Sequence, residues 1–578
     1  AIRAAIASGV NITYKILYND AVAMTGGQPV DGQLSVVKIA HQLHGEGIAR
    51  IAVCSDDIEK YTRGNFPAGT TYTHRDDLDA LQCELREYQG ASVIIYDQTC
   101  AAEKRRRRKR GLMPDPEIRP FINTAVCEGC GDCGKQSNCL SVVPDETPYG
   151  RKRKIEQSSC NKDMSCVKGF CPSFVTVTGG SIRTAAVTPA SFDFSQIPEP
   201  VLPVHDQPYG VVLAGVGGTG VTTLGAILGM AAHIEGKGAS VLDMTGLAQK
   251  FGAVITHLQV ANKAEDIHAA RIAAGGAKLV IGCDLVVAAS NDSMVKVDRG
   301  QAAAIINGHE AMTAEFTRNP DAKFPAKSMH DIIKECVGDE TTDFVDATEV
   351  VENLLGDTMA ANVFLTGYAY QKGLIPISSE AIIEAIRLNG AAVDENLTAF
   401  NLGRLKAHNP AAVQYGEEEI VEPQSFEELV ADRRAYLVAY QNESLATLYQ
   451  AKVEAITQKF GEDIGLIVAR YYFKVLAYKD EYEVARLYSD GRFKAALAYK
   501  LSILLAPPLL APVDKHSGLP RKLTFGSWIF PMFTLMAKFK FLRGTALDPF
   551  GYTKDRKLER EIRQDYEQLL DKVLSLDK

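Results

Sequence analysis

Long apolar runs are missing from this chain of 578 residues, and so are an excess of positive charge and any internal repeat. The longest uncharged stretch, residues 209–232, is rich in glycine, which is typical of a strand, a loop and a helix and not of a membrane span. The formal net charge of −8 argues against general nucleic-acid binding. No signal peptide precedes the first predicted strand. Hydrophobic and charged contents of 46% and 23% are ordinary for a globular protein, and the length predicts about three or four domains.

Cysteine, by contrast, is concentrated in one region. Seven of the twelve cysteines fall within 45 residues, and Pro172 follows the last of them: Cys127, Cys130, Cys133, Cys139, Cys160, Cys166 and Cys171. This spacing is typical of the ferredoxin motif C-x2-C-x2-C-x3-C-P, whose thiolates hold iron–sulfur clusters and whose fourth cysteine serves the other cluster. Zinc or disulfides are the alternatives, but zinc would leave thiolates over. Free thiols beside oxygen-sensitive clusters favour a reducing cytoplasm.

Swapped ligation predicts two clusters with different ligand sets. One cluster would have four cysteine ligands: Cys127, Cys130, Cys133 and Cys171. Cys160 and Cys166 are separated as the first and third cysteines of the motif are, and Asp163 stands where the second cysteine would be. The other cluster would have these ligands: Cys139, Cys160, Cys166, and Asp163 or an open corner. It would be a [4Fe–4S] cluster with an aspartate ligand or a [3Fe–4S] cluster. A cluster with four cysteine ligands has no open site for substrate, so electron transfer is the expected role.

Residues 1 to about 115 alternate between β-rich and helical segments. This is the βαβ order of a parallel sheet covered by helices. Ligands of such sheets bind beyond the carboxyl ends of the strands, where the segment YNDAVAMTGGQ of residues 18–28 falls. The chain opens inside a helix-like run, AIRAAIASG, so we expect it to continue something upstream.

The basic segment EKRRRRKRG, residues 103–111, follows this region. We interpret it as a solvated linker, and docking of an acidic electron carrier is the alternative. The cysteine region then runs to about residue 180, and the proline-rich residues 181–208 predict an interdomain linker.

A second α/β domain is predicted for residues 209–400. From about Phe426 apolar residues recur at steps of three and four, which predicts helices, and the charged tail after Thr553 predicts an exposed amphipathic helix. Residues 401–578 are therefore expected to form a mostly helical domain.

A glycine loop follows the first strand of this second domain. Gly215, Gly217 and Gly220 fit the dinucleotide fingerprint G-x-G-x-x-G, and Asp243 ends the next predicted strand, where a ribose-binding acid would lie. An ATPase P-loop is disfavoured because Val221 stands where its lysine would be. Two interpretations stay open: close packing of helix on strand through small residues, or binding of a phosphate group such as that of coenzyme A.

Three motifs together, YNDAVAMTGGQ, CEGCGDCGKQSNC and AGVGGTGVTTLG, resemble the carboxy-terminal half of the fused bacterial indolepyruvate:ferredoxin oxidoreductases, which are 2-oxoacid:ferredoxin oxidoreductases. The motifs occur in the family's order, so the resemblance covers about the whole chain. It implies a multidomain α/β fold with these parts: the C-terminal part of a parallel-sheet domain that binds thiamine diphosphate (1–115), a small ferredoxin-like iron–sulfur module (116–180), a linker (181–208), a Rossmann-like gamma-type domain (209–400) and a mostly helical C-terminal domain (401–578).

The resemblance also implies an activity. The family decarboxylates a 2-oxoacid on thiamine diphosphate, passes two electrons through [4Fe–4S] clusters to ferredoxin and forms an acyl-CoA. Indolepyruvate, or another arylpyruvate, is expected as substrate from the resemblance alone. The expected partners are ferredoxin, a second copy of the enzyme and the upstream N-terminal half, and the expected location is the cytoplasm.

The same resemblance assigns cofactor-binding residues and leaves the catalytic residues unknown. Asn19 would give a side-chain oxygen to Mg²⁺ and Ala21 a backbone carbonyl, which suits a cation that prefers oxygen ligands. The loop expected against thiamine diphosphate consists of Thr25, Gly26, Gly27 and Gln28. The loop that would hold coenzyme A consists of Gly215, Gly217, Gly218 and Thr219.

The family's thiamine motif begins upstream with a G-D-G signature whose aspartate binds Mg²⁺. None of the 18 residues before Asn19 contains it, so we expect this chain to be one part of a larger enzyme. Two other functions stay open: an NAD(P)-linked iron–sulfur electron-transfer subunit, and an electron-transfer and docking subunit that has no substrate site. The YNDAVAMTGGQ segment favours the thiamine enzyme, because neither alternative needs it.

Overall fold

The computed structural model describes residues 1–576 except 22–29, 33, 180–191, 247–251, 414–424, 492, 494–499, 507–510 and 512–521. The chain divides into two compact units. The first comprises residues 1–115 and 246–252, and the second comprises residues 116–245 and 253–578. Among the described residues, no helix combines the length and the apolar character needed to cross a membrane.

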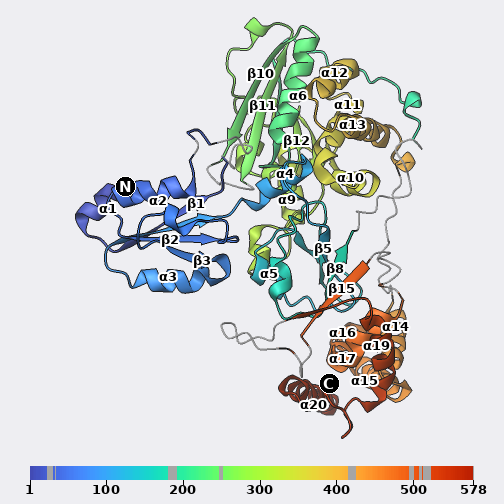
Figure 1. The fold of residues 1–578 in the computed structure, drawn as a ribbon. Coiled ribbons are helices and arrows are strands. Elements are labelled where there is room, and N and C mark those ends of the chain that lie inside the picture. Colours follow the sequence, from blue (N-terminus) through green and yellow to red (C-terminus); the bar gives the residue numbers. More distant parts are fainter. Residues whose placement is uncertain are drawn as a thin grey trace. The chain divides into compact units, whose positions relative to one another are not determined.

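The first unit contains a four-stranded sheet in which all neighbouring strands are parallel (Figure 1). The order across the sheet is β1-β4-β2-β3. The strands are β1 Ile12–Tyr18, β2 Arg50–Ser55, β3 Thr71–His74 and β4 Ala91–Asp97. The helices are α1 Ile2–Ser8, α2 Val36–Gly45, α3 Leu78–Arg86 and α4 Ala101–Lys109.

Alternate residues of the central strands β2 and β4 enter two different cores. Val53 and Ile95 pack with Ile39 of α2, whereas the next residue on β2, Cys54, packs with Leu85 of α3. Both faces of the sheet are therefore covered by helices, as parallel sheets require. The parallel sheet predicted for residues 1–115 is confirmed.

The basic segment predicted to be a solvated linker is instead the helix α4, so that prediction is wrong. Its cations have acidic partners inside the first unit. Glu103 is buried and forms ion pairs with Arg106 and Arg107, one turn along the helix. Lys104 lies 3.0 Å from a carboxylate oxygen of Asp56. A run of basic residues predicts a solvent-exposed segment only when no acidic residue can pair with it. Here the fold places Asp56 and Glu103 within ion-pair distance of the basic side chains.

The largest sheet of the second unit has six strands in the order β10-β11-β9-β12-β13-β14. The strands are β9 Tyr209–Val216, β10 Gly238–Thr245, β11 Ala253–Ala261, β12 Ala277–Gly282, β13 Ala303–Asn307 and β14 Thr342–Val345. Strands β9, β12, β13 and β14 are parallel neighbours, but β11 pairs antiparallel with both β9 and β10. A Rossmann sheet places the second strand parallel and beside the first. This sheet differs because β11 lies between β9 and β10.

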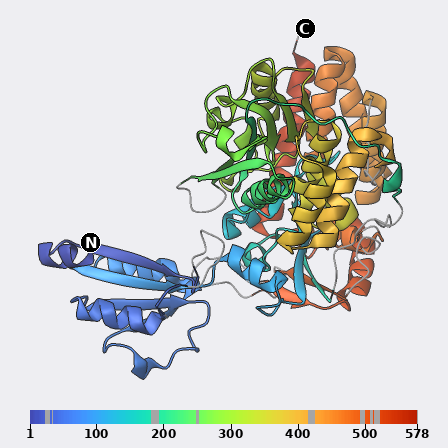
Figure 2. The ribbon, with the colours of Figure 1, turned by 90° about the horizontal axis from the view of Figure 1, so that it is seen from above.

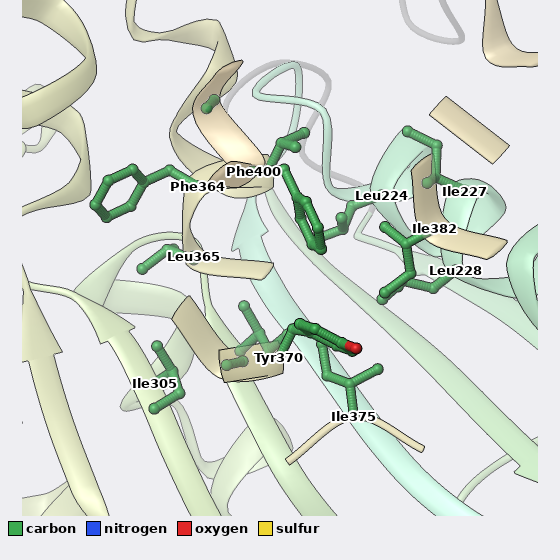
Figure 3. Packing of buried hydrophobic residues seen from close by; sticks show 14 of the residues in the cluster. Leu224, Ile227, Leu228, Ile305, Phe364, Leu365, Tyr370, Ile375, Ile382 and Phe400 are labelled. Carbon is green, nitrogen blue, oxygen red and sulfur yellow. The ribbon is translucent and has the colours of Figure 1, made fainter. Parts of the chain in front are cut away.

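Helices cover both faces of this sheet. One core joins strand residues such as Leu213 to the following helices: α6 Val221–Ile234, α10 Ala347–Leu355, α11 Ala361–Gln371, α12 Ser379–Asn389 and α13 Val393–His408. Figure 2 shows the helices of residues 361–408, in yellow and amber, packed side by side. Tyr370 and Phe400 lie between these helices and the sheet (Figure 3). The opposite core, which contains Val212, is formed with α7 Leu285–Ala288, α8 Asn291–Met294 and α9 Ala326–Val337.

A smaller sheet carries the cysteine region, and two of its four strands come from the end of the chain. Its order is β16-β15-β8-β5. The strands are β5 Ile118–Ile122, β8 Phe174–Thr178, β15 Lys500–Leu505 and β16 Leu523–Phe525. A short helix and a two-stranded hairpin lie between β5 and β8: α5 Asp132–Ser137, β6 Val142–Asp145 and β7 Lys152–Ile155. Figure 1 shows β15, in orange, beside β8.

The remaining elements are helical, and the prediction of helices after Phe426 is confirmed. They are α14 Phe426–Tyr440, α15 Glu443–Phe460, α16 Glu462–Leu476, α17 Glu481–Ser489, α19 Ile529–Lys538 and α20 Lys554–Ser575. The tail after Thr553 forms α20 as predicted, and Leu570 on its apolar side enters the core of α14 to α16.

Candidate functional site

Six of the seven clustered cysteines, all except Cys130, line one small core of the second unit, together with apolar side chains of β5 to β8. Cys127, Cys133 and Cys166 are buried, whereas Cys130 is exposed. All twelve cysteines of the chain are free thiols, so no disulfide joins any of them. The seven side chains are therefore available as thiolate ligands.

Electrostatic coupling joins four of these thiols. Burial and, after it, the neighbouring thiols Cys127, Cys171 and Cys130, each of which would add a second negative charge nearby, raise the pKa of Cys133 to about 12. Burial also raises the pKa of Cys171, and the same two partners, Cys127 and Cys130, add to that effect. We call Cys127, Cys130, Cys133 and Cys171 the first cysteine group.

A second cysteine group consists of Cys139, Cys160 and Cys166. Burial and, after it, Cys139 and Cys160 raise the pKa of Cys166 to about 12. Cys133 of the first group has a smaller effect on the same thiol, so the two groups are neighbours. The thiols that most strongly affect one another's pKa values are those that swapped ligation would place around the same cluster.

The two cysteine loops repeat the same backbone conformation. In the first loop Gly129 and Gly131, two and four residues after Cys127, have φ of +69° and +79°. In the second loop Lys162 and Met164, two and four residues after Cys160, have φ of +57° and +63°. Side chains disfavour the left-handed region, so two such residues in four positions indicate a conformation imposed by the loop. Sequence reasoning missed this repeat, since lysine and methionine give no signal for positive φ.

This conformation aims backbone donors at the cysteine sulfurs. The N–H of Gly129 donates to Sγ of Cys127 over 3.3 Å, and the N–H of Lys162 donates to Sγ of Cys160 over 3.4 Å. Sγ of Cys171 lies 2.9 Å from the hydroxyl of Ser173. Such donors favour the anionic sulfur, which is the form that binds metal.

Asp163 occupies the step of the second loop that Cys130 occupies in the first. It is exposed, and its carboxylate accepts a hydrogen bond from the Ser165 hydroxyl. Among the described residues, no three His, Cys, Asp or Glu side chains converge closely enough to hold a single metal ion. A cluster is larger than one ion, so its ligands need not converge in that way.

The residues predicted to bind Mg²⁺ lie at the carboxyl end of β1. The side-chain oxygen of Asn19 accepts a hydrogen bond from the N–H of Ala21 over 3.2 Å, and Ala21 is buried. Asp20 between them has φ of +54° and forms two hydrogen bonds with Arg107 of α4, at 3.0 and 3.1 Å. The Asn19 oxygen keeps one lone pair for a cation, so the residue suits one position of a magnesium shell. Thr25, Gly26, Gly27 and Gln28 lie outside the described residues.

Asp97 is a second polar residue at this edge, and sequence reasoning missed it. It ends β4 directly beside Tyr18 of β1 and Ser55 of β2. The carboxylate is buried, which raises its pKa, and Nζ of Lys60 lies 2.7 Å away, which partly offsets that rise. The available signal was its position at a strand end, although such residues are common in loops of any kind.

The glycine loop connects β9 to α6, as predicted, and its glycines differ in role. A Cβ on Gly215 would lie 2.7 Å from Cγ2 of Val221 and 2.8 Å from Cβ of Cys283, so this glycine permits close packing. Gly218 has φ of +93° and nothing within 4 Å of a Cβ position. Thr219 closes the turn by donating its hydroxyl to the Val216 carbonyl over 2.7 Å. Gly217 lies between these residues, in the same turn.

Asp243 does not occupy the position expected of a ribose-binding acid. It lies on the edge strand β10, and β11 separates that strand from β9 and the glycine loop. Its carboxylate accepts a hydrogen bond from the Thr256 hydroxyl of β11. The dinucleotide interpretation required β10 to be the parallel neighbour of β9, but β11 lies between them and is antiparallel to both.

A buried acid lies beside the same loop. Asp284 accepts a hydrogen bond from the Val287 N–H over 2.9 Å and so caps α7, but its Oδ2 is buried and has no hydrogen-bond partner among the described residues. That oxygen lies 3.4 Å from the Cβ position of Gly215. Burial raises the pKa of Asp284. The sequence could not predict this site, because it does not reveal that the Asp284 carboxylate is buried.

The six-stranded sheet and its helices identify part of the chain. Residues 210–405 match the family described as pyruvate ferredoxin/flavodoxin oxidoreductase. This part of the chain is therefore similar to the 2-oxoacid:ferredoxin oxidoreductases.

The curated relatives that this part of the chain resembles are indolepyruvate oxidoreductase subunits. An indolepyruvate oxidoreductase subunit IorB from Thermococcus kodakarensis is 28% identical over 198 residues, which are 34% of this chain and 94% of that protein. The subunit of the same name from Archaeoglobus fulgidus is 29% identical over 209 residues, 35% of this chain and 98% of that protein. About two thirds of the chain therefore lies outside each of these matches.

Two further similarities concern other aspects of the chain. Residues 426–578 match a family of unknown function, DUF6537. A solved structure, the gamma subunit of a keto/oxoacid ferredoxin oxidoreductase from Geobacter sulfurreducens, aligns with 35% of this chain and 98% of its own at 18% identity. The TM-score is 0.26, which is too low to support an argument about the fold.

Proposed function

We propose that this chain is the iron–sulfur and gamma-type part of a thiamine-diphosphate-dependent 2-oxoacid:ferredoxin oxidoreductase. The enzyme would oxidatively decarboxylate an arylpyruvate such as indolepyruvate, form an acyl-CoA and pass the electrons to ferredoxin. The observation that carries the proposal is the pair of cysteine loops with equivalent backbone conformations, in a chain whose residues 210–405 match this enzyme family.

Two iron–sulfur clusters are proposed from the donor set. Their soft, anionic sulfur ligands would be the two cysteine groups, and the clusters when bound would carry electrons one at a time. The N–H groups of Gly129 and Lys162 support this assignment, because such donors stabilise thiolate sulfur. The pKa values of Cys133 and Cys166 rise to about 12 in the absence of iron, and a metal would reverse that effect by supplying positive charge.

Asp163 is proposed as the fourth ligand of the cluster at the second cysteine group. Its place in the loop matches that of Cys130, and its carboxylate is exposed. A carboxylate is a harder and weaker ligand for iron than a thiolate. This corner of the cluster is therefore expected to be labile.

Magnesium and thiamine diphosphate are proposed to bind at the carboxyl end of β1 in the larger enzyme. Asn19 would give its neutral amide oxygen to Mg²⁺ and Ala21 its carbonyl, while Thr25, Gly26, Gly27 and Gln28 would lie against the cofactor. When bound, thiamine diphosphate supplies the electron sink for decarboxylation. The remaining oxygen ligands are expected from the diphosphate and from the upstream half of the enzyme, which is a proposed partner.

Coenzyme A is proposed to bind at the glycine loop of Gly217, Gly218 and Thr219, which leads into the N-terminus of α6. The open surroundings of Gly218 favour this use. The contacts of Gly215 favour a packing role instead, so within this loop we assign only that residue to structure. Ferredoxin, a second copy of the enzyme and a cytoplasmic location complete the proposal.

The test uses the complete enzyme that contains this chain, purified without oxygen. Iron and sulfide analysis should give about seven or eight irons per chain, as two clusters require. Indolepyruvate with coenzyme A should then reduce ferredoxin and leave NAD(P)⁺ unchanged. Reduction of NAD(P)⁺ in place of ferredoxin would support the alternative of a nicotinamide-linked electron-transfer subunit. Clusters with no oxidation of any 2-oxoacid would indicate an electron-transfer subunit without a substrate site.

A further inference from the structure

The C-terminal region of unknown function, residues 426–578, completes the sheet that carries the cysteine loops. Strand β15 pairs antiparallel with β8, from Lys500 opposite Thr178 to Ile503 opposite Val175. Ile503 is fully buried and shares a core with Val175 and with Tyr488 of α17. The two regions therefore have one continuous core, although they lie far apart in the sequence.

Three side chains of the C-terminal region reach the backbone of the cysteine loops. Nζ of Lys479 donates to the carbonyl of Ala125, two residues before Cys127, over 2.8 Å. The Tyr488 hydroxyl donates to the carbonyl of Pro172, directly after Cys171, over 2.8 Å. Nζ of Lys522 donates to the carbonyl of Val167, directly after Cys166, over 3.0 Å.

Lys522 is the cation in the most informative position. Its ammonium lies over the ring of Phe174, 5.0 Å from the centroid, at the start of β8. Burial lowers its pKa, and Cys171, Asp132, Cys166 and Cys133 oppose that effect in this order. The ammonium thus contacts Val167, which follows Cys166 of the second cysteine group, and Phe174, three residues after Cys171 of the first group.

A fixed cation beside an iron–sulfur cluster favours the reduced state, because reduction adds one negative charge to the cluster. The effect is strong where the cation is partly buried, since solvent screens it less. Lys522 meets both conditions. Lys540 of the same region provides a contrast, because its Nζ also donates to backbone carbonyls, those of Val438 and Ala439, but it lies among α14 residues and arginines.

We propose that residues 426–578 act as a cap on the cluster module, in which Lys522 is a positioning residue that raises the reduction potential of the iron–sulfur clusters beside it. The inference rests on the proposed iron–sulfur function. The region of unknown function thereby acquires a defined role, because it holds a positive charge and part of an apolar core against loops made by a distant part of the chain.

The experiment compares five forms of the full chain, each purified without oxygen: wild type, Lys522→Met, Lys522→Gln, Lys522→Arg and the matched control Lys540→Met. Dithionite is added stepwise with redox mediators, and electron paramagnetic resonance follows the fraction of reduced cluster. Iron and sulfide are counted in every sample. We expect Lys522→Met to lower the ratio of reduced to oxidised cluster about tenfold at a fixed potential, which is about 59 mV for a one-electron couple. Lys522→Arg and Lys540→Met should titrate like the wild type.

Each other outcome has a defined meaning. An unshifted potential in Lys522→Met with full iron content would overturn the inference and leave the proposed clusters standing. Loss of iron from Lys522→Met and Lys522→Gln, but not from Lys522→Arg, would still support a required charge. Equal loss from all three variants would indicate a packing role and overturn it. A wild type that contains no iron or sulfide would instead contradict the proposed function itself.

Discussion

Asp163 and Cys130 occupy equivalent steps of two backbone loops, each three residues after a cysteine and each between two residues of positive φ. The loops differ in what flanks this step: glycines in the first, and Lys162 and Met164 in the second. A carboxylate thus takes the place of a thiolate in a loop whose conformation is otherwise retained.

This relationship predicts the behaviour of the cluster at the second cysteine group. Aerobic purification should remove iron from the corner at Asp163 and give a [3Fe–4S] signal, because the carboxylate is the weaker ligand. Asp163→Cys should suppress that signal. Electron paramagnetic resonance and iron counting measure both effects. A spectrum that the substitution leaves unchanged, together with only four irons in the wild type, would refute the two-cluster arrangement.

Backbone conformation predicts opposite effects of two substitutions. Gly129→Ala should destabilise the cluster module by about 3 kcal/mol, because the side chain disfavours positive φ and its Cβ would lie 2.3 Å from the carbonyl oxygen of Arg151. Met164→Gly should instead be tolerated, since glycine adopts positive φ without strain. Thermal unfolding of the apo and cluster-loaded chains, followed by circular dichroism, compares the two. Equal destabilisation by both would show that backbone strain is not what distinguishes these loops.

Asn19→Ala should lower thiamine diphosphate content and 2-oxoacid oxidation steeply in the complete enzyme. The substitution removes one of about six ligands of an ion that requires near-octahedral geometry. Cluster absorbance should be unchanged, because the cysteines belong to the other compact unit. Cofactor analysis after gel filtration gives the occupancy. Normal occupancy in the variant would mean that the cofactor site lies elsewhere.

The basic helix α4 predicts a dependence of ferredoxin reduction on salt. Arg105→Gln should slow ferredoxin reduction at low ionic strength and have little effect at high ionic strength, since exposed charges are screened beyond about 10 Å at ~0.1 M salt. Arg107→Gln should have a further effect, because it releases Asp20 next to Asn19. Stopped-flow reduction of ferredoxin, with a small uncharged dye as control acceptor, distinguishes an effect on ferredoxin docking from an effect on the enzyme itself. If Arg105→Gln slows both acceptors equally, the helix has a structural role only.

Asp284 predicts a pH dependence of stability. Burial raises its folded pKa above the unfolded value, so its contribution is fully present at low pH and is lost as pH rises through the folded pKa. Asp284→Asn removes the charge but keeps a side chain that can cap α7. The melting temperature of the variant should therefore rise relative to that of the wild type as pH increases from about 4 to 8. A constant difference across this range would show that the carboxylate does not titrate within it.

Local pattern was sufficient to predict the parallel sheet of residues 1–115, the strand and helix around the glycine loop, and the helices after Phe426. These features depend on neighbours in the sequence. Sequence pattern gave wrong predictions where residues distant in the sequence determine the local structure. The basic segment is a helix in which acids from its own first turn and from distant loops pair with three of its seven cations, and the Rossmann-like sheet is mixed because β11 lies between β9 and β10.

The candidate site shows the same division. Cysteine spacing was sufficient to predict the two cysteine groups and the place of Asp163 in the second loop, because both depend only on distances along the sequence. It gave no indication of Lys522 or Tyr488, which reach the loops from more than 300 residues away. Nor could it show that Lys162 and Met164 adopt positive φ, because neither residue type favours that conformation.

The pairing of β8 with β15 has a consequence for how the protein is made. Thr176 donates its hydroxyl to the Ser502 carbonyl, and these residues are 326 positions apart. At ordinary rates of about 5–20 residues per second, a ribosome needs roughly 16–65 s to synthesise that interval. Throughout this time the cysteine loops exist without the strand that closes their sheet. Synthesis itself thus provides an interval in which the loops are accessible to the machinery that delivers iron and sulfide, and the arrival of β15 ends it.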